Sequence, residues 1–408
     1  MKKRFSILVV STVIFGVVFG LVGTVLVSQA APETPMARKI VIFSGEVNEP
    51  AREALIKKFG AETLKALPLI NGMVVLLPPK AEKALAEQAG VLRIDNDDTV
   101  LVLKGKPVPT PPPPPPAETL PWGVDRINAE IVWGGSEDAV NVIPGSNTGQ
   151  GVKVAILDTG IDIDHPDLVV VGGANVLGPF RTDQYDDDNG HGTHVAGTVA
   201  ALDNEEGVIG VAPGAELYAV KAFNRKGIGF VSDIVDGLNW IIDNNMQVVN
   251  MSFGELGDNV SLRDAIQRAY GAGIVMVAAA GNDGDAFIYY PARYPQTIAV
   301  SATDRDDQLA SFSSYATDIT QVELINLLAA PGKDIKSTWK GGGYYVGSGT
   351  SMATPHVVGT AALVIRSGIS DVSEVMNILK GTAEDLGTTG IDPYFGYGLV
   401  DAEAATIR

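Results

Sequence analysis

The sequence contains no cysteine and only four histidines in 408 residues. Without cysteine, neither a disulfide framework nor thiolate chemistry is available. Lysine and arginine are also few, 30 against 48 aspartates and glutamates, which gives a formal net charge of −18. Because nucleic-acid phosphates require clustered basic side chains, we expect no nucleic-acid partner. A protein that works outside the cell without disulfides must hold its loops in another way, and the excess of carboxylates makes calcium the natural candidate.

Residues 1–30 have the pattern of a secretory signal. The basic start MKKR precedes an apolar run over residues 7–27, and the small residues Ser28 and Ala30 offer a cleavage site. We therefore expect a signal peptide over 1–30 and a secreted protein. Because the apolar run is long enough to span a bilayer, an uncleaved membrane anchor is the alternative.

An unbroken proline run at residues 111–116 divides the remaining chain, because stiff polyproline II cannot join a packed core. We expect a linker over 105–117 and a main domain over 118–408. Upstream, the apolar pattern predicts a small α+β domain with strands over 39–44, 70–77 and 91–103 and helices over 50–59 and 81–88.

Downstream of the prolines, apolar runs alternate with helical patterns. Strands are expected over residues 152–157, 217–222, 248–251 and 274–279, and helices over 194–202, 232–244 and 262–270. This alternation predicts an α/β fold, a three-layer sandwich around a mainly parallel sheet with right-handed crossovers. Functional residues should lie at the carboxyl ends of the strands.

Three segments carry candidate catalytic residues. Asp158 follows a strand in VAILDTG, His191 lies among glycines in NGHGTHVAG, and Ser351 lies in GSGTSMATPH at the start of a helix. Taken alone, Asp158 could be a turn carboxylate and Ser351 an N-cap, while a His191/His194 metal pair has weak spacing. Together they supply what a hydroxyl nucleophile needs: a base within hydrogen-bond reach and a carboxylate that fixes its tautomer.

The order Asp, His, Ser is the subtilisin order, and the three segments resemble the signatures of the subtilase family over about residues 122–405. The resemblance implies that Asp158 orients the imidazole, that His191 acts as general base and then acid, and that Ser351 attacks the scissile carbonyl. It also implies that Asn282, in AAAGNDG, donates its amide to the oxyanion beside the backbone N–H of Ser351. On its own, Asn282 would be a turn residue.

The same resemblance implies a cleft that clamps an extended polypeptide between two segments by backbone hydrogen bonds. Phe253 and Ile234 would line an apolar pocket there, although either could be ordinary core, and Tyr289 would lie near the floor of the main specificity pocket. The expected substrate-binding residues are Gly227, Ile228, Gly229, Ile234, Ser252, Phe253, Gly254 and Tyr289.

The resemblance further implies a tight Ca²⁺ site in the acidic loop that interrupts the helix after His194, since the match assigns a set of hard oxygen ligands there. Without the resemblance this segment is simply a solvated acidic loop. The implied ligands are the side chains of Glu118, Asp167 and Asn204 and the carbonyls of Leu202, Glu206 and Val208. The run at 186–188 could hold a second calcium, although such runs are more often solvated.

Residues 31–104 resemble the inhibitory prosegments of secreted subtilases, which implies a small ferredoxin-like α+β domain. Its last strand, over 98–104, would lie in the cleft and deliver Lys104 to Ser351, so we expect self-cleavage between Lys104 and Gly105. The prosegment would then remain bound as an inhibitor of a monomeric enzyme. A catalytically silent calcium-binding surface protein and a bilayer-anchored processing protease of narrow specificity are the alternatives.

Overall fold

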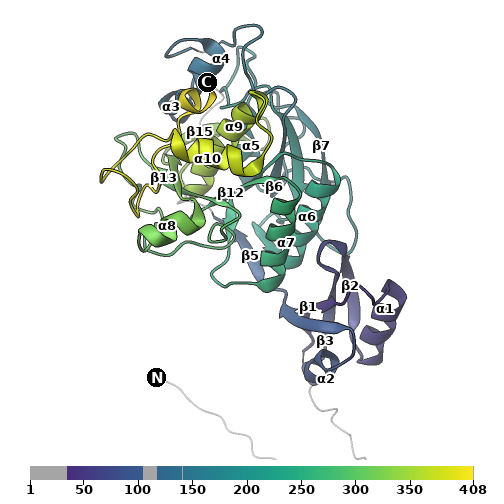
Figure 1. The fold of residues 1–408 in the computed structure, drawn as a ribbon. Helices are drawn as coiled ribbons and strands as arrows, with labels where there is room; N and C mark the ends of the chain where they lie inside the picture. The colour runs from purple at the N-terminus through teal and green to yellow at the C-terminus, as the bar shows by residue number, and fades with distance from the viewer. Residues whose placement is uncertain (1–34, 104–116, 140, 408) are drawn as a thin grey trace, which may run out of the picture. The chain divides into compact units, whose positions relative to one another are not determined.

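The computed structural model describes residues 35–103, 117–139 and 141–407 (Figure 1). The expected signal peptide, most of the linker, and Lys104 and Gly105 lie outside these residues. Among the described residues, no helix is long and apolar enough to cross a membrane.

The N-terminal region is a four-stranded antiparallel sheet with two helices. Its elements are β1 (Ala37–Phe43), α1 (Glu49–Lys58), β2 (Glu62–Leu67), the 3₁₀ turn η1 (Pro68–Ile70), β3 (Gly72–Leu77), α2 (Glu82–Ala86) and β4 (Val91–Asn96). The strand order β2-β3-β1-β4 is the ferredoxin-like order, as predicted. Val41 and Phe43 of the sheet share a separate small core with Ile56 of α1 and Leu85 of α2.

Two features of this region differ from the prediction. The strand β2 was not expected, because its sequence ETLKAL mixes charged and apolar residues. The segment over 91–103, expected to be strand, forms two strands, β4 and β5 (Thr99–Val102). The second of them, β5, leaves the first sheet and pairs with β9 (Ile228–Phe230) and β11 (Phe253–Gly254).

The main domain is built on a seven-stranded parallel sheet, which confirms the predicted fold class. The strand order is β14-β13-β12-β10-β6-β8-β7. The strands are β6 (Lys153–Asp158), β7 (Val170–Asn175), β8 (Glu216–Lys221), β10 (Val248–Met251), β12 (Val275–Ala279), β13 (Ile298–Thr303) and β14 (Leu328–Pro331). Of these, β7, β13 and β14 were not predicted.

Helices cover both faces of the sheet. The longer ones are α5 (His191–Ala200), α6 (Val231–Asp243), α7 (Val260–Gly271), α9 (Thr350–Arg366) and α10 (Val372–Gly381). The remaining elements are α3 (Trp122–Arg126), α4 (Ala129–Gly134), α8 (Ile319–Ile325), α11 (Ala402–Thr406) and the hairpin of β15 (Ile335–Trp339) and β16 (Gly343–Gly347).

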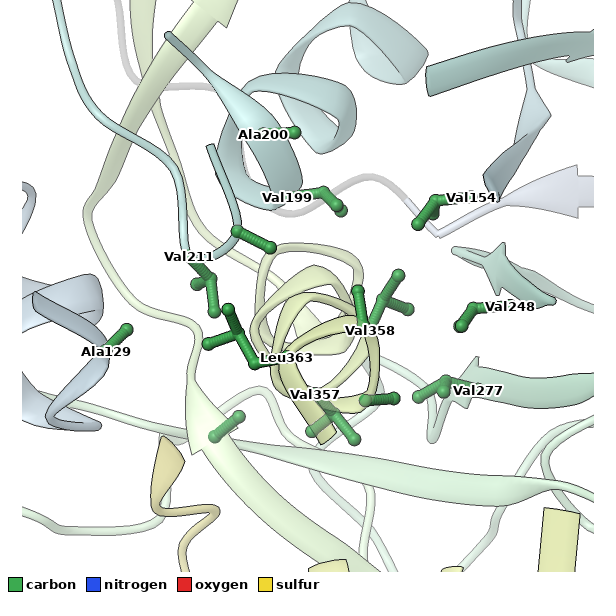
Figure 2. Packing of buried hydrophobic residues seen from close by; sticks show 14 of the residues in the cluster. Ala129, Val154, Val199, Ala200, Val211, Val248, Val277, Val357, Val358 and Leu363 are labelled. Carbon is green, nitrogen blue, oxygen red and sulfur yellow. The ribbon is translucent and has the colours of Figure 1, made fainter. Parts of the chain in front are cut away.

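Alternate residues of the sheet enter different cores. Val154 and Ile156 of β6 belong to one buried apolar cluster with residues of α5 and α9, and Ala155 and Leu157 belong to another with residues of α6 and α7. In Figure 2, Val357, Val358 and Leu363 of α9 are surrounded by side chains from the sheet and from neighbouring segments. The N-terminus of α9, which carries Ser351, therefore begins a helix fixed by packing on several sides.

Candidate active site

Asp158 and His191 are paired at the carboxyl end of the sheet. Asp158 is the last residue of β6 and is fully buried, and His191 is the first residue of α5. Nδ1 of His191 lies 2.8 and 2.9 Å from the two carboxylate oxygens of Asp158. Because a carboxylate only accepts, Nδ1 carries the proton and Nε2 keeps its lone pair. Nε2 is buried, and no hydrogen-bond partner for it lies among the described residues.

The start of α5 is held by Asp187, a residue that the triad motifs do not indicate. Its carboxylate accepts hydrogen bonds from the backbone N–H groups of Asn189, Gly190 and Thr193 and from the hydroxyls of Thr159 and Thr193. The N-terminal N–H groups of a helix need such acceptors. Asp187 therefore fixes the turn that carries His191. The sequence indicates this role only by the presence of a carboxylate four residues before His191.

Ser351 and Asn282 meet at one carbonyl oxygen. Oγ of Ser351 lies 2.7 Å from the carbonyl oxygen of Leu103, and Nδ2 of Asn282 donates to the same oxygen at 2.8 Å. Ser351 is the second residue of α9, so its own backbone N–H belongs to the first turn, whose N–H groups lack partners within the helix.

The amide of Asn282 is oriented by Thr350. Oδ1 of Asn282 accepts from the backbone N–H of Thr350 at 2.8 Å and from its hydroxyl at 3.0 Å. With the oxygen of the amide held in this way, the nitrogen must point toward Leu103. The sequence analysis did not predict that Thr350 orients the Asn282 amide, although Thr350 directly precedes Ser351.

The predicted substrate segments lie on either side of β5, which pairs with β9 and β11. Leu101 is opposite Gly254 on one side and Ile228 on the other, and all pairings of β5 are antiparallel. At the end of β5, the N–H of Val102 donates to the carbonyl of Gly227, and the N–H of the next residue, Leu103, donates to the carbonyl of Ser252. The segments predicted around Gly229 and Phe253 are thus brought together by a strand of the N-terminal region.

The predicted register of this strand is wrong by one residue. The carbonyl at Ser351 is that of Leu103, not of Lys104. Burial explains the register, because Val100 and Val102 are 0% and 7% exposed whereas Leu101 is 48% exposed. A shift of one residue would move the two valines to solvent and bury Leu101 instead.

Ile234 and Phe253 belong to the same buried apolar cluster as Val100 of β5, and both are fully buried. The ring of Phe253 also packs on that of Phe223, with centroids 5.0 Å apart. These residues thus join the core of the main domain to the strand in the cleft. Tyr289 lines a cavity beside Leu101, Val102 and Leu103.

The residues predicted to hold calcium are close together. Leu202 N–H donates to the carbonyl of Asp167, Val208 N–H donates to the Asp167 carboxylate, and the N–H of Asn204 donates to Glu118. Nδ2 of Asn204 lies 3.3 Å from Oδ1 of Asp167, and its Oδ1 accepts from Glu206 N–H.

The charges of this loop fit a cation. Burial, together with the nearby carboxylate of Glu118, raises the pKa of Asp167 to about 7. Burial also raises the pKa of Glu118, with Asp203 adding to the effect. Two neighbouring carboxylates that are costly to ionise would be stabilised by a cation, and hard oxygen donors of this kind suit Ca²⁺.

The other metal possibilities find less support. Nε2 of His194 lies 3.1 Å from the carbonyls of both Ile335 and Tyr345, so this ring is engaged with the β15–β16 hairpin. In the acidic run over 186–188, Asp187 accepts hydrogen bonds at the start of α5, and Asp188 forms an ion pair with Lys221 at 2.7 Å. Across the described ranges, no three His, Asp or Glu side chains are grouped to hold a metal. The predicted loop site uses only two carboxylates.

Comparisons with known proteins agree with this geometry. The Peptidase S8 profile of the subtilase family matches residues 149–398. Subtilisin NAT from Bacillus subtilis subsp. natto is 36% identical over 413 aligned positions, covering 99% of this chain and 98% of that protein. Subtilisin Savinase from Lederbergia lenta is 46% identical over 291 positions, covering 71% of this chain and 100% of that protein. M-protease from Shouchella clausii is 46% identical over 346 positions, covering 85% and 82%.

The chain therefore belongs to the subtilase family, as its motifs predicted. It is a serine endopeptidase and acts on polypeptides.

Proposed function

We propose that this protein is a secreted, self-maturing endopeptidase with Asp158, His191 and Ser351 as its catalytic triad and Asn282 as a donor to the oxyanion. One observation carries the proposal. A single peptide carbonyl, that of Leu103, is held at once by Oγ of Ser351 and Nδ2 of Asn282, at 2.7 and 2.8 Å. The carbonyl group of Leu103 therefore lies next to both the proposed nucleophile and a donor that could stabilise its oxygen.

The proposed reaction uses the tautomer of His191. Asp158 keeps the proton of His191 on Nδ1, so the lone pair of Nε2 is free. In the reaction the hydroxyl of Ser351 would leave the carbonyls of Leu103 and Ser252 and give its proton to Nε2 as Oγ bonds to the carbonyl carbon. The negative charge that develops on the carbonyl oxygen is stabilised by the amide of Asn282 and the first turn of α9. His191 then gives its proton to the leaving amine, the C–N bond breaks, and water hydrolyses the acyl-enzyme with His191 as base.

We propose that other polypeptides bind in the place of β5. Backbone pairing with the segments at 227–229 and 252–254 is independent of sequence, so the pockets for alternate side chains determine which bonds are cut. Ile234 and Phe253 would receive the side chain that corresponds to Val100. The names alkaline protease and M-protease among the relatives are consistent with activity on proteins.

We propose that residues 31–103 are an inhibitory prosegment, which ends one residue earlier than the sequence predicted. Asp97 accepts from the N–H and the hydroxyl of Ser232 at the start of α6, and Asp95 accepts from the hydroxyl of Ser261 in the first turn of α7. Carboxylates at helix N-termini are favourable partners. These contacts lie away from the reacting carbonyl and would keep the segment bound after cleavage.

Maturation would thus cut the bond between Leu103 and Lys104, and leave the residues from 104 onward at the start of the enzyme. The signal peptide over 1–30 and the linker over 105–117 belong to the same proposal, as does a monomeric main domain over 118–408. A bound calcium ion would connect the loop after α5 to the segment at 118–119. Its ligands would be the side chains of Glu118, Asp167 and Asn204 and the carbonyls of Leu202, Glu206 and Val208.

The test compares the parent chain with Ser351→Ala, both secreted by a host that lacks other proteases. The parent should degrade casein and yield a fragment that begins at Lys104, whereas Ser351→Ala should remain folded, inactive and uncut at this bond. N-terminal sequencing and mass spectrometry read the cleavage sites. Cutting of Ser351→Ala at the same bond would contradict self-processing, and retention of residues 1–30 in a membrane fraction would contradict secretion.

A further inference from the structure

Glu255 is a buried carboxyl group beside the strand β5. It directly follows Gly254, which is the partner of Leu101 in the β5–β11 pairing. The residue is only 8% exposed, and its Oε1 is buried with no hydrogen-bond partner among the described residues. Its main chain is fixed by hydrogen bonds in both directions with Tyr290, at 2.9 and 3.0 Å. The group is therefore held in place and loses water at one oxygen without gaining a hydrogen bond there.

The carboxylates around Glu255 come from two parts of the chain. Asp97 and Asp98 act on it from the prosegment, Asp258 acts from its own loop, and all three repel a negative charge on its carboxyl group. Tyr294 is also a neighbour, and it is uncharged because burial raises the pKa of its hydroxyl well above its ordinary value. These surroundings favour the neutral, protonated form of Glu255.

The arginines next to these carboxylates are already paired. Arg38 forms an ion pair with Asp97, and Arg263 forms one with Asp258 at 3.1 Å. Within the part of the chain that the structure describes, no lysine or arginine forms an ion pair with Glu255. An ionised Glu255 would thus be a buried charge without a counter-ion for as long as the prosegment is docked.

Burial, together with the three neighbouring carboxylates, raises the pKa of Glu255 to about 8. Two of these carboxylates, Asp97 and Asp98, belong to the prosegment, and so does the strand that lies beside Glu255. Departure of the prosegment would remove both carboxylates and admit water. The pKa of Glu255 should then return toward the ordinary value of a glutamate, about 4.3.

We propose that Glu255 makes release of the prosegment depend on pH: its carboxyl group keeps a proton while the prosegment is docked and gives it to solvent when the prosegment leaves. Because the docked state binds the extra proton, docking is strongest below the ordinary pKa of glutamate. It weakens as the pH rises from there to about 8, by up to about tenfold for each pH unit. This inference rests on the proposed function, because it assumes that residues 31–103 are an inhibitory prosegment.

The test uses the full chain after it has processed itself at pH 6, with the cleaved complex diluted into buffers at pH 6, 7 and 8. The initial activity on a tetrapeptide anilide that ends in Leu is divided by that of fully activated enzyme at the same pH. This ratio gives the free fraction of enzyme and cancels the pH dependence of catalysis itself. For the parent, we expect the dissociation constant of the prosegment to rise at least about tenfold from pH 6 to pH 8.

Glu255→Gln keeps the shape of the side chain but cannot ionise, so it should remove most of this rise. Glu323→Gln is the matched control, because it removes the same charge from an exposed position of α8 and should behave like the parent. The inactive Ser351→Ala chain gives a second test if Glu255→Gln does not process itself. Adding Glu255→Gln to that chain should reduce the fall in Tm between pH 6 and pH 8, and adding Glu323→Gln should not.

Two outcomes would overturn the inference and leave the proposed function standing. One is a parent whose prosegment binds equally well at pH 6 and pH 8, and the other is a Glu255→Gln variant that shows the full rise of the parent. A folded parent that cuts neither itself nor casein would instead contradict the proposed function.

Discussion

At the scale of single residues, the reactive groups are positioned by neighbours that the family motifs do not mark. Asp187 holds the turn before His191, and Thr350 holds the oxygen of the Asn282 amide. Each of these hydrogen bonds fixes one end of a group. Asp187 fixes the turn that carries His191, and Thr350 fixes the oxygen of the Asn282 amide, so that the amide nitrogen is turned toward the carbonyl of Leu103. Such pre-organisation avoids reorientation when charge develops on the carbonyl oxygen.

Asn282→Leu tests this arrangement. Leucine has a similar size but no donor, so the oxyanion would lose one hydrogen bond that matters mainly in the transition state. We expect kcat to fall about 10²–10³-fold, or about 2.7–4 kcal/mol, as for the equivalent donor of a subtilisin, with little change in KM. Steady-state kinetics on a Leu anilide measures both values, and a thermal melt checks folding. A raised KM with unchanged kcat would contradict the assignment.

Residue types and their order were sufficient to predict the family and the class of enzyme, but they did not fix which carbonyl lies at Ser351. The motifs around Asp158, His191 and Ser351 are local and specific. The register of β5 depends on the burial of Val100 and Val102 against the main domain, which is a long-range contact.

At the scale of elements, strands with continuous apolar runs were predictable and irregular ones were not. The runs that became β6, β8, β10 and β12 are buried on both faces, and hydrophobic periodicity detects such strands. The strand β7, with the sequence VVGGAN, carries two glycines that weaken the signal. The strand β2 includes Lys65, which would ordinarily indicate an exposed position.

Lys65 is instead buried against the main domain. It is 5% exposed, and its Nζ lies 3.0 Å from Asp233 and 3.3 Å from Asp236 of α6 and also contacts the carbonyl of Val176. Burial raises the pKa of Asp233, while the charge of Lys65 acts to lower it. Removal of the lysine would therefore leave the buried Asp233 without its cation, whereas Asp236 would keep Arg181 at 2.7 Å.

We expect Lys65→Met to weaken the hold of the cleaved prosegment on the enzyme. Loss of one partner from a buried pair costs about 3–5 kcal/mol, which corresponds to more than a hundredfold in affinity. Caseinolytic activity of the full chain should therefore appear after a shorter lag than in the parent. Lys83→Met is the control, because Lys83 is an exposed residue of α2 in the same region. Equal lags for both variants would show that the buried pair does not contribute to inhibition.

At the scale of the whole molecule, the absence of cysteine leaves the long loops of the main domain without covalent links. The loop after α5 is attached to the segment at 118–119 through the parallel bridge between Thr119 and Val208. It is attached to Asp167 through hydrogen bonds from Leu202 and Val208. A cation bound by these three segments would stabilise the folded state, because the unfolded chain does not bring its ligands together.

Removal of calcium from the Ser351→Ala chain, which cannot digest itself, isolates this contribution. Metal at a hundredfold excess over its Kd adds about 2.7 kcal/mol, and for a domain of this size a chelator should then lower Tm by roughly 4 °C. Adding Asp167→Ala should lower Tm in calcium and abolish the response to chelator. Adding Asp186→Ala, in the acidic run outside the proposed site, should leave the response intact. Identical melting curves of the Ser351→Ala chain with calcium and with chelator would contradict the proposed calcium site, and loss of the response in Asp186→Ala alone would place the metal at the acidic run.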